Sequence, residues 1–175
     1  GQSEQTWQLS DPLPVDPAVR IDTLENGLSF YIRENHKPEN RAELRLVVNA
    51  GSVLEKERQR GLAHFVEHMA FNGTRDFARQ ELVDYLESIG MKFGPDLNAY
   101  TGFDETVYIL QLPTDDSTIV ETGFDILMNW AGHISFEPKE IEKERGVILE
   151  EWRYRRGAAA RIRDQHYPVL FRDSR

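Results

Sequence analysis

Residues 62–74, with the sequence LAHFVEHMAFNGT, are the segment from which the fold and the chemistry of this chain are best predicted. Its apolar residues recur at the spacing of an amphipathic helix: Leu62, Phe65, Val66, Met69 and Ala70. Successive residues of a helix are rotated by about 100°, so His64, Glu67 and His68 share the opposite face. We expect a helix over residues 62–71 that packs on the core and directs two imidazoles and a carboxylate into a cleft or into solvent.

Two histidines four residues apart on a helix can both direct a ring nitrogen at one metal ion. Zinc in catalytic sites takes three protein ligands and leaves a fourth position for water. The spacing His-x-x-Glu-His of residues 64–68 is the inverse of the more common zinc-protease order, and Glu67 is placed to take a proton from a zinc-bound water. The alternative is that these side chains coincide on an ordinary solvated helix face, because short motifs match by chance.

A third ligand has to come from elsewhere in the chain, and the helix predicted from residue 138 to about 154 offers several carboxylates. Glu140, Glu144 and Glu151 share one face of it, whereas Glu150 points about 100° away from Glu151. Each of these groups is equally consistent with a solvated or arginine-paired charge. The spacing alone leaves the choice among Glu140, Glu144 and Glu151 open.

The rest of the chain predicts an α+β fold, a two-layer sandwich of helices packed on a largely antiparallel sheet. Strands are expected at residues 28–32, 44–48, 97–101 and 106–112, the first two as a hairpin or near neighbours. Further helices are expected at residues 77–89 and from Asp115 or Asp116 to about 134. Prolines between residues 11 and 17 predict an extended lead-in over residues 1–20, followed by one domain over residues 21–175.

Composition excludes several classes of protein. The net charge of −9 over 175 residues argues against a nucleic-acid partner. Five arginines cluster late in the chain, as a solvated helix face or as a contact for an anionic partner: Arg153, Arg155, Arg156, Arg161 and Arg163. The absence of cysteine excludes disulfides and cysteine-based zinc sites. No apolar stretch approaches the roughly 20 residues of a transmembrane helix.

Three segments in this order carry a family resemblance: HFVEHMAFNGT at residues 64–74, LNAYT at residues 97–101 and ERGVILEE at residues 144–151. Together they resemble the pitrilysin family of inverted-motif zinc peptidases, which includes insulin-degrading enzyme and the mitochondrial processing peptidase. The likeness extends from about residue 22 to the end of the chain. It implies a pitrilysin-like peptidase domain, a zinc-dependent endopeptidase acting on peptides or unfolded polypeptides.

Position by position, the resemblance implies that His64, His68 and Glu151 bind one Zn²⁺ ion. It makes Glu67 and Glu144 the catalytic carboxylates. Glu67 would be the general base that acts on a zinc-bound water. Glu144, two helical turns before Glu151, would contact the ligands without binding the metal itself.

The resemblance also implies that residues 97–101 form an edge strand beside the zinc. Asn98, Ala99 and Tyr100 would then hold an extended substrate by strand addition. The alternative for Tyr100, and for Phe103 after it, is simple packing in the core.

Members of the family have further domains, so the chain is expected to be the N-terminal piece of a longer peptidase, with little activity without its C-terminal domains. The sequences of its motifs resemble those of bacterial members of the family, which are often exported. A periplasmic or secreted location is therefore expected, with the signal segment absent from this sequence. Some members are non-catalytic structural or peptide-binding subunits, and the complete set of His64, Glu67, His68 and Glu151 argues against that alternative.

Overall fold

The computed structural model describes residues 10–91 and 97–173. The chain divides into two compact units between Glu39 and Asn40. In the first unit, strand β1 (Val19–Thr23) pairs with β2 (Ser29–Arg33) in an antiparallel hairpin. Gly27 makes the turn with a φ of +87°, a conformation that favours glycine. Residues 10–18 contain no helix or strand, and the lead-in predicted over residues 1–20 overlaps the first two residues of β1.

The predicted hairpin of residues 28–32 with residues 44–48 is wrong. Strand β2 pairs with β1. Strand β3 (Arg41–Val48) pairs with β5 (Thr106–Pro113), and both of these strands belong to the second unit. The turn at Gly27 joins β2 to β1, a strand that was not predicted because its sequence VRIDT combines two apolar residues with charged ones. A turn signal indicates a hairpin without saying which flanking segment is the partner.

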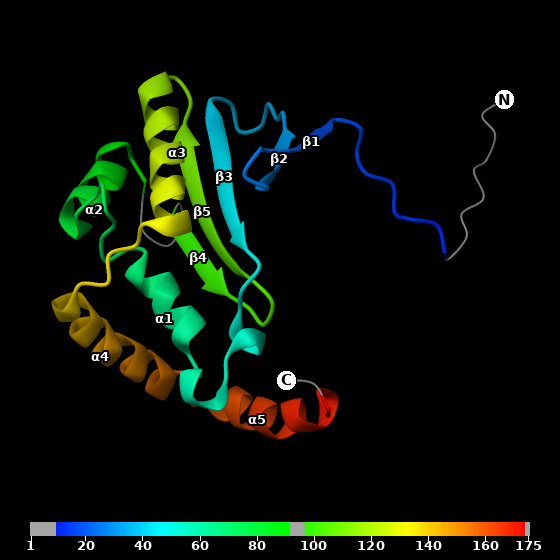
Figure 1. The fold of residues 1–175 in the computed structure, drawn as a ribbon, viewed down its shortest axis with the longest axis vertical. Coiled ribbons are helices and arrows are strands. Elements are labelled where there is room, and N and C mark those ends of the chain that lie inside the picture. Colours follow the sequence, from blue (N-terminus) through cyan, green and yellow to red (C-terminus); the bar gives the residue numbers. More distant parts are fainter. Residues whose placement is uncertain (1–9, 92–96, 174–175) are drawn as a thin grey trace. The chain divides into compact units, whose positions relative to one another are not determined.

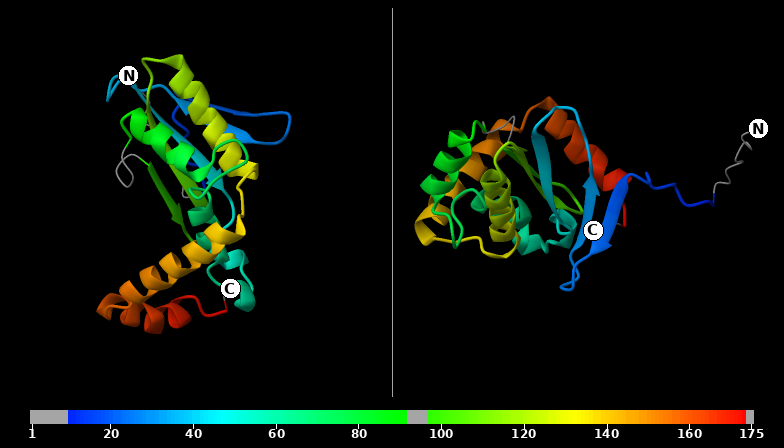
Figure 2. Two further views of the ribbon diagram at one scale, coloured as in Figure 1. Left: turned by 90° about the vertical axis from the view of Figure 1, so that its left-hand side faces the viewer. Right: turned by 90° about the horizontal axis from the view of Figure 1, so that it is seen from above.

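The second unit holds one antiparallel sheet in the order β3-β5-β4, in which β4 spans Leu97–Thr101. In register, Tyr108 lies opposite both Leu46 and Ala99, so these three side chains share the face that carries the core. Helix α3 (Ser117–Gly132) contacts β3 and β5, as Figures 1 and 2 show. Helix α1 (Leu62–Met69) contacts β4, β5 and helix α4 (Pro138–Tyr154). The α+β architecture of helices packed on an antiparallel sheet is thereby confirmed.

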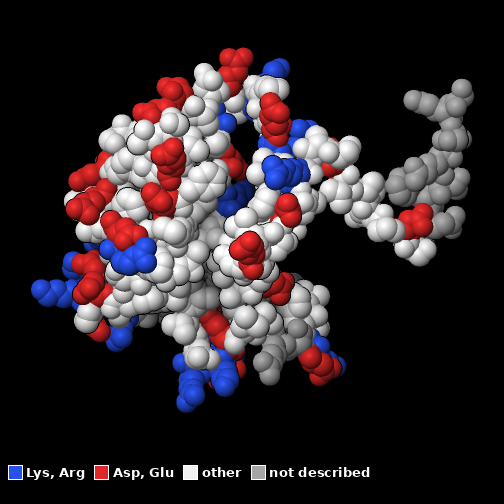
Figure 3. Space-filling view, turned by 45° about the horizontal axis from the view of Figure 1, so that its top comes forward, with Lys and Arg blue, Asp and Glu red and all other residues white. Residues whose placement is uncertain are grey.

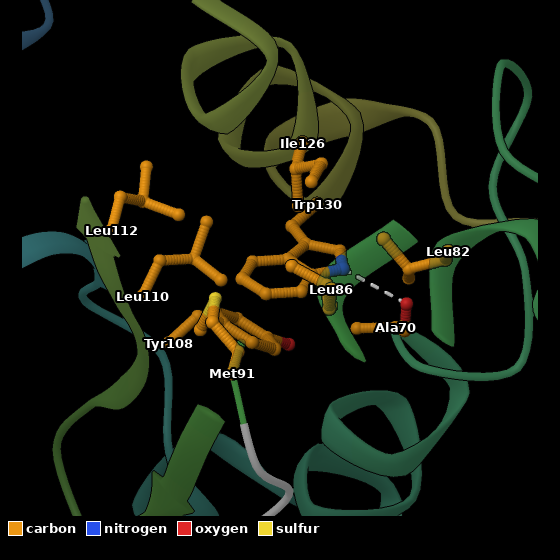
Figure 4. Packing of buried hydrophobic residues seen from close by; sticks show 9 residues of the cluster. All are labelled: Ala70, Leu82, Leu86, Met91, Tyr108, Leu110, Leu112, Ile126 and Trp130. Carbon is orange, nitrogen blue, oxygen red and sulfur yellow. Dashed lines mark hydrogen bonds between the residues drawn. The ribbon is translucent and has the colours of Figure 1, made fainter. Parts of the chain in front are cut away.

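The buried core lies between this sheet and its helices (Figure 4). Helix α2 (Arg79–Ser88) adds Leu82 and Leu86 to it. Trp130 of α3 is 2% exposed, packs against the rings of Phe71 and Tyr108, and donates a hydrogen bond from Nε1 to the carbonyl oxygen of Ala70 at 2.9 Å. This bond attaches α3 directly to the end of α1, the helix that carries the two histidines.

Replacing Trp130 by phenylalanine is therefore expected to destabilise the fold. The variant loses the buried hydrogen bond and leaves the Ala70 carbonyl without that donor, a cost of about 1–3 kcal/mol in the free energy of unfolding. Urea denaturation measures the difference. Trp152→Phe is the matched control, because Trp152 is 57% exposed on α4. Equal stability of the two variants would contradict the importance of the Trp130 contact.

The helices predicted from the sequence are confirmed with small shifts at their ends, and one helix was missed. Asp116 caps α3 by accepting a hydrogen bond from the backbone of Thr118 at 2.8 Å. Helix α5 (Ala158–Leu170) was not predicted, since it combines arginines with an internal proline, Pro168. Leu62 was expected in the core but is 49% exposed, because it lines an open apolar hollow of about 490 Å³ beside α1.

Most of the late arginines contact partners within the chain. Arg153 pairs with Glu150 and Arg155 pairs with Glu151, while the guanidinium of Arg156 lies 4.5 Å from the ring centre of Trp152. On the face shown in Figure 3, acidic and basic side chains are interspersed. None of the helices that the structure describes combines the length and apolar character needed to cross a lipid bilayer.

Candidate metal centre and active site

Helix α1 begins with a carboxylate placed on its N-terminus from outside the helix. The backbone N–H groups of Gly61 and Ala63 donate to the two carboxylate oxygens of Glu55 at 2.8 and 2.7 Å. A negative charge at this end satisfies unpaired donors and is favoured by the helix dipole. Gly61 takes a φ of +86°, which turns the chain into the helix. Glu55 and Gly61 thus fix the turn from which His64 projects.

His64 and His68 project from the same side of α1 and converge with Glu151 of α4. The two Nε2 atoms lie 3.1 Å apart, and Glu151 Oε2 lies 3.6 Å from that of His64 and 3.5 Å from that of His68. Among the described residues these three form the group whose ligand atoms could hold a metal ion. Glu151 Oε1 pairs with Arg155, but Oε2 is buried without a hydrogen-bond partner among the described residues. A buried carboxylate oxygen in this state is costly and calls for a cation or a proton.

Glu144 lies directly behind His68. It is 8% exposed, and its Oε1 accepts a hydrogen bond from His68 Nδ1 at 2.7 Å. A proton held on Nδ1 leaves the lone pair of Nε2 directed at the cluster, an arrangement common among metal-binding histidines. Glu144 therefore contacts His68 on the side of the ring that faces away from the cluster.

The other glutamates considered for the third ligand point elsewhere. Glu140 pairs with Lys143 and Arg79, and Glu150 is exposed and pairs with Arg153. Of the carboxylates on α4, Glu151 approaches both histidines, and Glu144 approaches the far side of His68.

Glu67 lies beside the cluster and is 8% exposed. Its Oε2 accepts a hydrogen bond of 2.5 Å from the hydroxyl of Thr101, the last residue of β4. Among the described residues its Oε1 has no hydrogen-bond partner. Burial, together with the charge of Glu67, raises the pKa of Tyr108 to about 12. The Tyr108 hydroxyl therefore stays protonated well above neutral pH.

The predicted substrate-binding residues lie on β4, which pairs with β5 on one side and forms an edge of the described sheet. Ala99 packs against the core. Tyr100 is 44% exposed, and its hydroxyl donates to Glu105 Oε1 at 2.8 Å, which raises the pKa of Tyr100. Asn98 pairs with Ile109 through the strand register, but its side chain lies outside the described residues.

The alternative of core packing for Tyr100 and Phe103 is wrong, since both side chains are exposed. The ring of Phe103 instead contacts those of Tyr167 and Phe171, at centroid distances of 5.8 and 5.6 Å. These contacts join the end of the β4–β5 hairpin to α5.

Three contacting residues were not identified as part of the site from the sequence: Glu55, Asn72 and Thr101. Thr101 contacts Glu67 across 34 residues, so no local spacing indicates this contact. Glu55 lies only six and eight residues before its two donors, but it is outside the helix and so outside the helical spacing. Asn72 carried a local signal, since a residue four positions after His68 can reach back to the carbonyl of that residue. Its side-chain amide donates to His68 O at 3.1 Å and to Glu144 Oε2 at 2.8 Å.

Sequence comparisons relate this chain to known proteases. Residues 31–165 match the model of the family described as Insulinase (Peptidase family M16). The chain is 42% identical over 173 residues to a probable zinc protease, PqqL, of Haemophilus influenzae, a match that covers 98% of this chain and 19% of the relative. A zinc protease PQQL-like protein of Arabidopsis thaliana is 44% identical over 152 residues, covering 87% of this chain and 16% of the relative.

The fold comparison agrees. The crystal structure of the periplasmic protease PqqL from Escherichia coli superposes with a TM-score of 0.88 at 38% identity, covering 93% of this chain and 18% of the other. The chain thus spans less than a fifth of the length of these relatives. The extent of the family match and the level of identity lead to one conclusion: the chain belongs to peptidase family M16, the insulinase or pitrilysin family.

Proposed function

We propose that this chain is the zinc-binding domain of an endopeptidase, in which His64, His68 and Glu151 hold one Zn²⁺ ion and Glu67 is the general base. The observation that supports it most strongly is the convergence of two imidazole nitrogens on a buried carboxylate oxygen that has no hydrogen-bond partner among the described residues.

The spacing of the cluster fits zinc. Ligand atoms 2.0–2.1 Å from a tetrahedral ion lie about 3.3–3.4 Å from one another, and the three distances here are 3.1, 3.5 and 3.6 Å. Two imidazoles and one carboxylate are also a known donor set of catalytic zinc. When bound, zinc polarises a peptide carbonyl and lowers the pKa of a coordinated water to about 7.

Glu67 has the position and surroundings of a general base. Thr101 holds Oε2 of its carboxylate, so Oε1 is available to accept a proton from the attacking water and to return it to the departing amine. Glu144 has a different role in this proposal. It fixes the tautomer and orientation of His68 through Nδ1 and does not itself exchange a proton with the substrate.

The substrate class that we propose is an extended peptide or an unfolded polypeptide. Strand β4 leads to Thr101 and hence to Glu67, and a peptide added along its outer edge would have its backbone held beside the general base. In this arrangement the backbone of Asn98, Ala99 and Tyr100 pairs with the substrate. The exposed Tyr100 ring contacts the substrate side chains on one face.

We further propose that domains C-terminal to residues 21–175 complete the enzyme, as the greater length of the relatives suggests. The Escherichia coli relative is described as a periplasmic protease. By that likeness, a periplasmic or secreted location is proposed for this protein.

The proposal is tested by incubating the zinc-loaded 175-residue chain with an unstructured peptide, beside the Haemophilus influenzae relative. We expect cleavage by the chain to be at least about tenfold slower, because misplacing a substrate by about 1 Å can cost roughly a hundredfold. Turnover within tenfold of the relative would contradict the need for further domains. Cleavage by either protein that survives a chelator would contradict zinc chemistry. A form extended to the length of the relatives that binds zinc without cleaving would favour a non-catalytic subunit.

A further inference from the structure

Among the described residues, Asn72 is the one buried side chain without a place in the proposed chemistry that hydrogen-bonds to both α1 and Glu144. It follows the end of α1 and is 6% exposed. Its Nδ2 group donates two hydrogen bonds, one to the carbonyl of His68 at 3.1 Å and one to Glu144 Oε2 at 2.8 Å. The first bond adds a second donor to the His68 carbonyl, which also accepts from the backbone N–H of Phe71 at 3.1 Å.

The chemistry of the neighbours fixes the orientation of this amide. A carbonyl oxygen and a carboxylate oxygen are both acceptors, so only the NH₂ end of Asn72 can face them. The two hydrogens of that group match the two acceptors. Both oxygens of the buried Glu144 carboxylate are then satisfied, Oε1 by His68 Nδ1 and Oε2 by Asn72.

We propose that Asn72 is a positioning residue that sets the tautomer of His68 through Glu144, an inference that rests on the proposed zinc site. Without the Asn72 amide, the Glu144 carboxylate can rotate to seek another donor for Oε2. Oε1 then no longer holds the proton of His68 on Nδ1. The Nε2 lone pair, which lies 3.1 Å from His64 Nε2 and 3.5 Å from Glu151 Oε2, loses its fixed direction.

The first measurement uses the metal-free chain, so that it does not depend on zinc or on catalysis. Long-range ¹H–¹⁵N correlations of the histidine rings report which nitrogen carries the proton. We expect His68 to be protonated on Nδ1 in the native chain and to show a mixture of tautomers in Asn72→Leu. Thr74→Val is the matched control, because Thr74 is also 6% exposed in the same loop and binds Phe77 rather than Glu144. The control should keep the native tautomer.

The second measurement is zinc affinity, by competition with a chromophoric chelator. Residues that hydrogen-bond to metal ligands typically contribute 10–100-fold to metal affinity. We therefore expect Asn72→Leu to weaken zinc binding by about tenfold. In a Glu144→Ala background the same substitution should change the affinity by less than about twofold, since residues that act through one another are not additive. A purely structural role of Asn72 would weaken binding equally in both backgrounds.

The outcomes separate this inference from the proposed function. A native tautomer in folded Asn72→Leu, or an additive loss in the double variant, would overturn the inference. If Asn72→Leu does not fold, Asn72→Ala replaces it. Unfolding of both variants while Thr74→Val folds would also overturn it, because Asn72 would then serve the stability of the loop. Failure of the native chain to bind zinc would refute the proposed site, while the tautomer measurement would still decide the role of Asn72.

Discussion

Glu67→Gln is expected to keep zinc affinity nearly unchanged and to slow peptide hydrolysis by roughly 100- to 10,000-fold, the usual contribution of general acid–base catalysis. Glutamine has the same shape, and its carbonyl oxygen can still accept the 2.5 Å hydrogen bond from Thr101. It cannot take a proton from water at neutral pH. The substitution therefore removes proton transfer while it preserves the surroundings of the metal ligands.

The measurement uses whichever form of the protein gives the higher peptide turnover, with zinc content and hydrolysis rate determined on the same sample. Glu121→Gln is a suitable control, since Glu121 is exposed on α3. Turnover by Glu67→Gln within a few-fold of the control would show that another group serves as the base. Loss of zinc together with activity would instead place Glu67 among the ligands.

The helix face that carries the proposed site could be predicted because helix geometry is local. His64, Glu67 and His68 lie within five residues, and any helix over this segment brings them together. The apolar spacing of the same segment indicated which side faces the core, and Met69 and Ala70 are fully buried there. Leu62 departs from the pattern, because at the first residue of α1 it lines the open hollow beside the helix.

The choice of Glu151 as the proposed third ligand shows where local spacing stops being informative. Three glutamates share one face of α4, so helical spacing alone does not distinguish which of them approaches the histidines. What distinguishes Glu151 is the crossing of α1 and α4, a tertiary contact that places it against both imidazoles and places Glu140 near Arg79 and Lys143. The resemblance to a known family supplied the assignment that helix geometry left open.

The other differences between the predicted and the observed structure also involve residues that are far apart in the sequence. The partner of β3 is β5, some sixty residues later, rather than its neighbour in the sequence. The contacts that hold the site residues in place also join distant parts of the sequence. Glu144 contacts His68 across 76 residues, and Thr101 contacts Glu67 across 34 residues. Contacts of this kind become visible only when the whole fold is present.

Glu151→Gln is expected to weaken zinc binding by more than about 100-fold. Even residues that only hydrogen-bond to metal ligands typically contribute 10–100-fold to metal affinity. An amide carries no negative charge to balance the cation and is a poor zinc ligand. Glu150→Gln is the matched control: it is the same substitution one residue away, and the Glu150 side chain is 71% exposed and pairs with Arg153. That variant should bind zinc like the native chain. Chelator competition on the two proteins measures the difference, and equal affinities would show that Glu151 is not the third ligand. The contrast is decisive because Arg155, which pairs with Glu151 Oε1, leaves Oε2 as the one atom of that residue directed at both histidines.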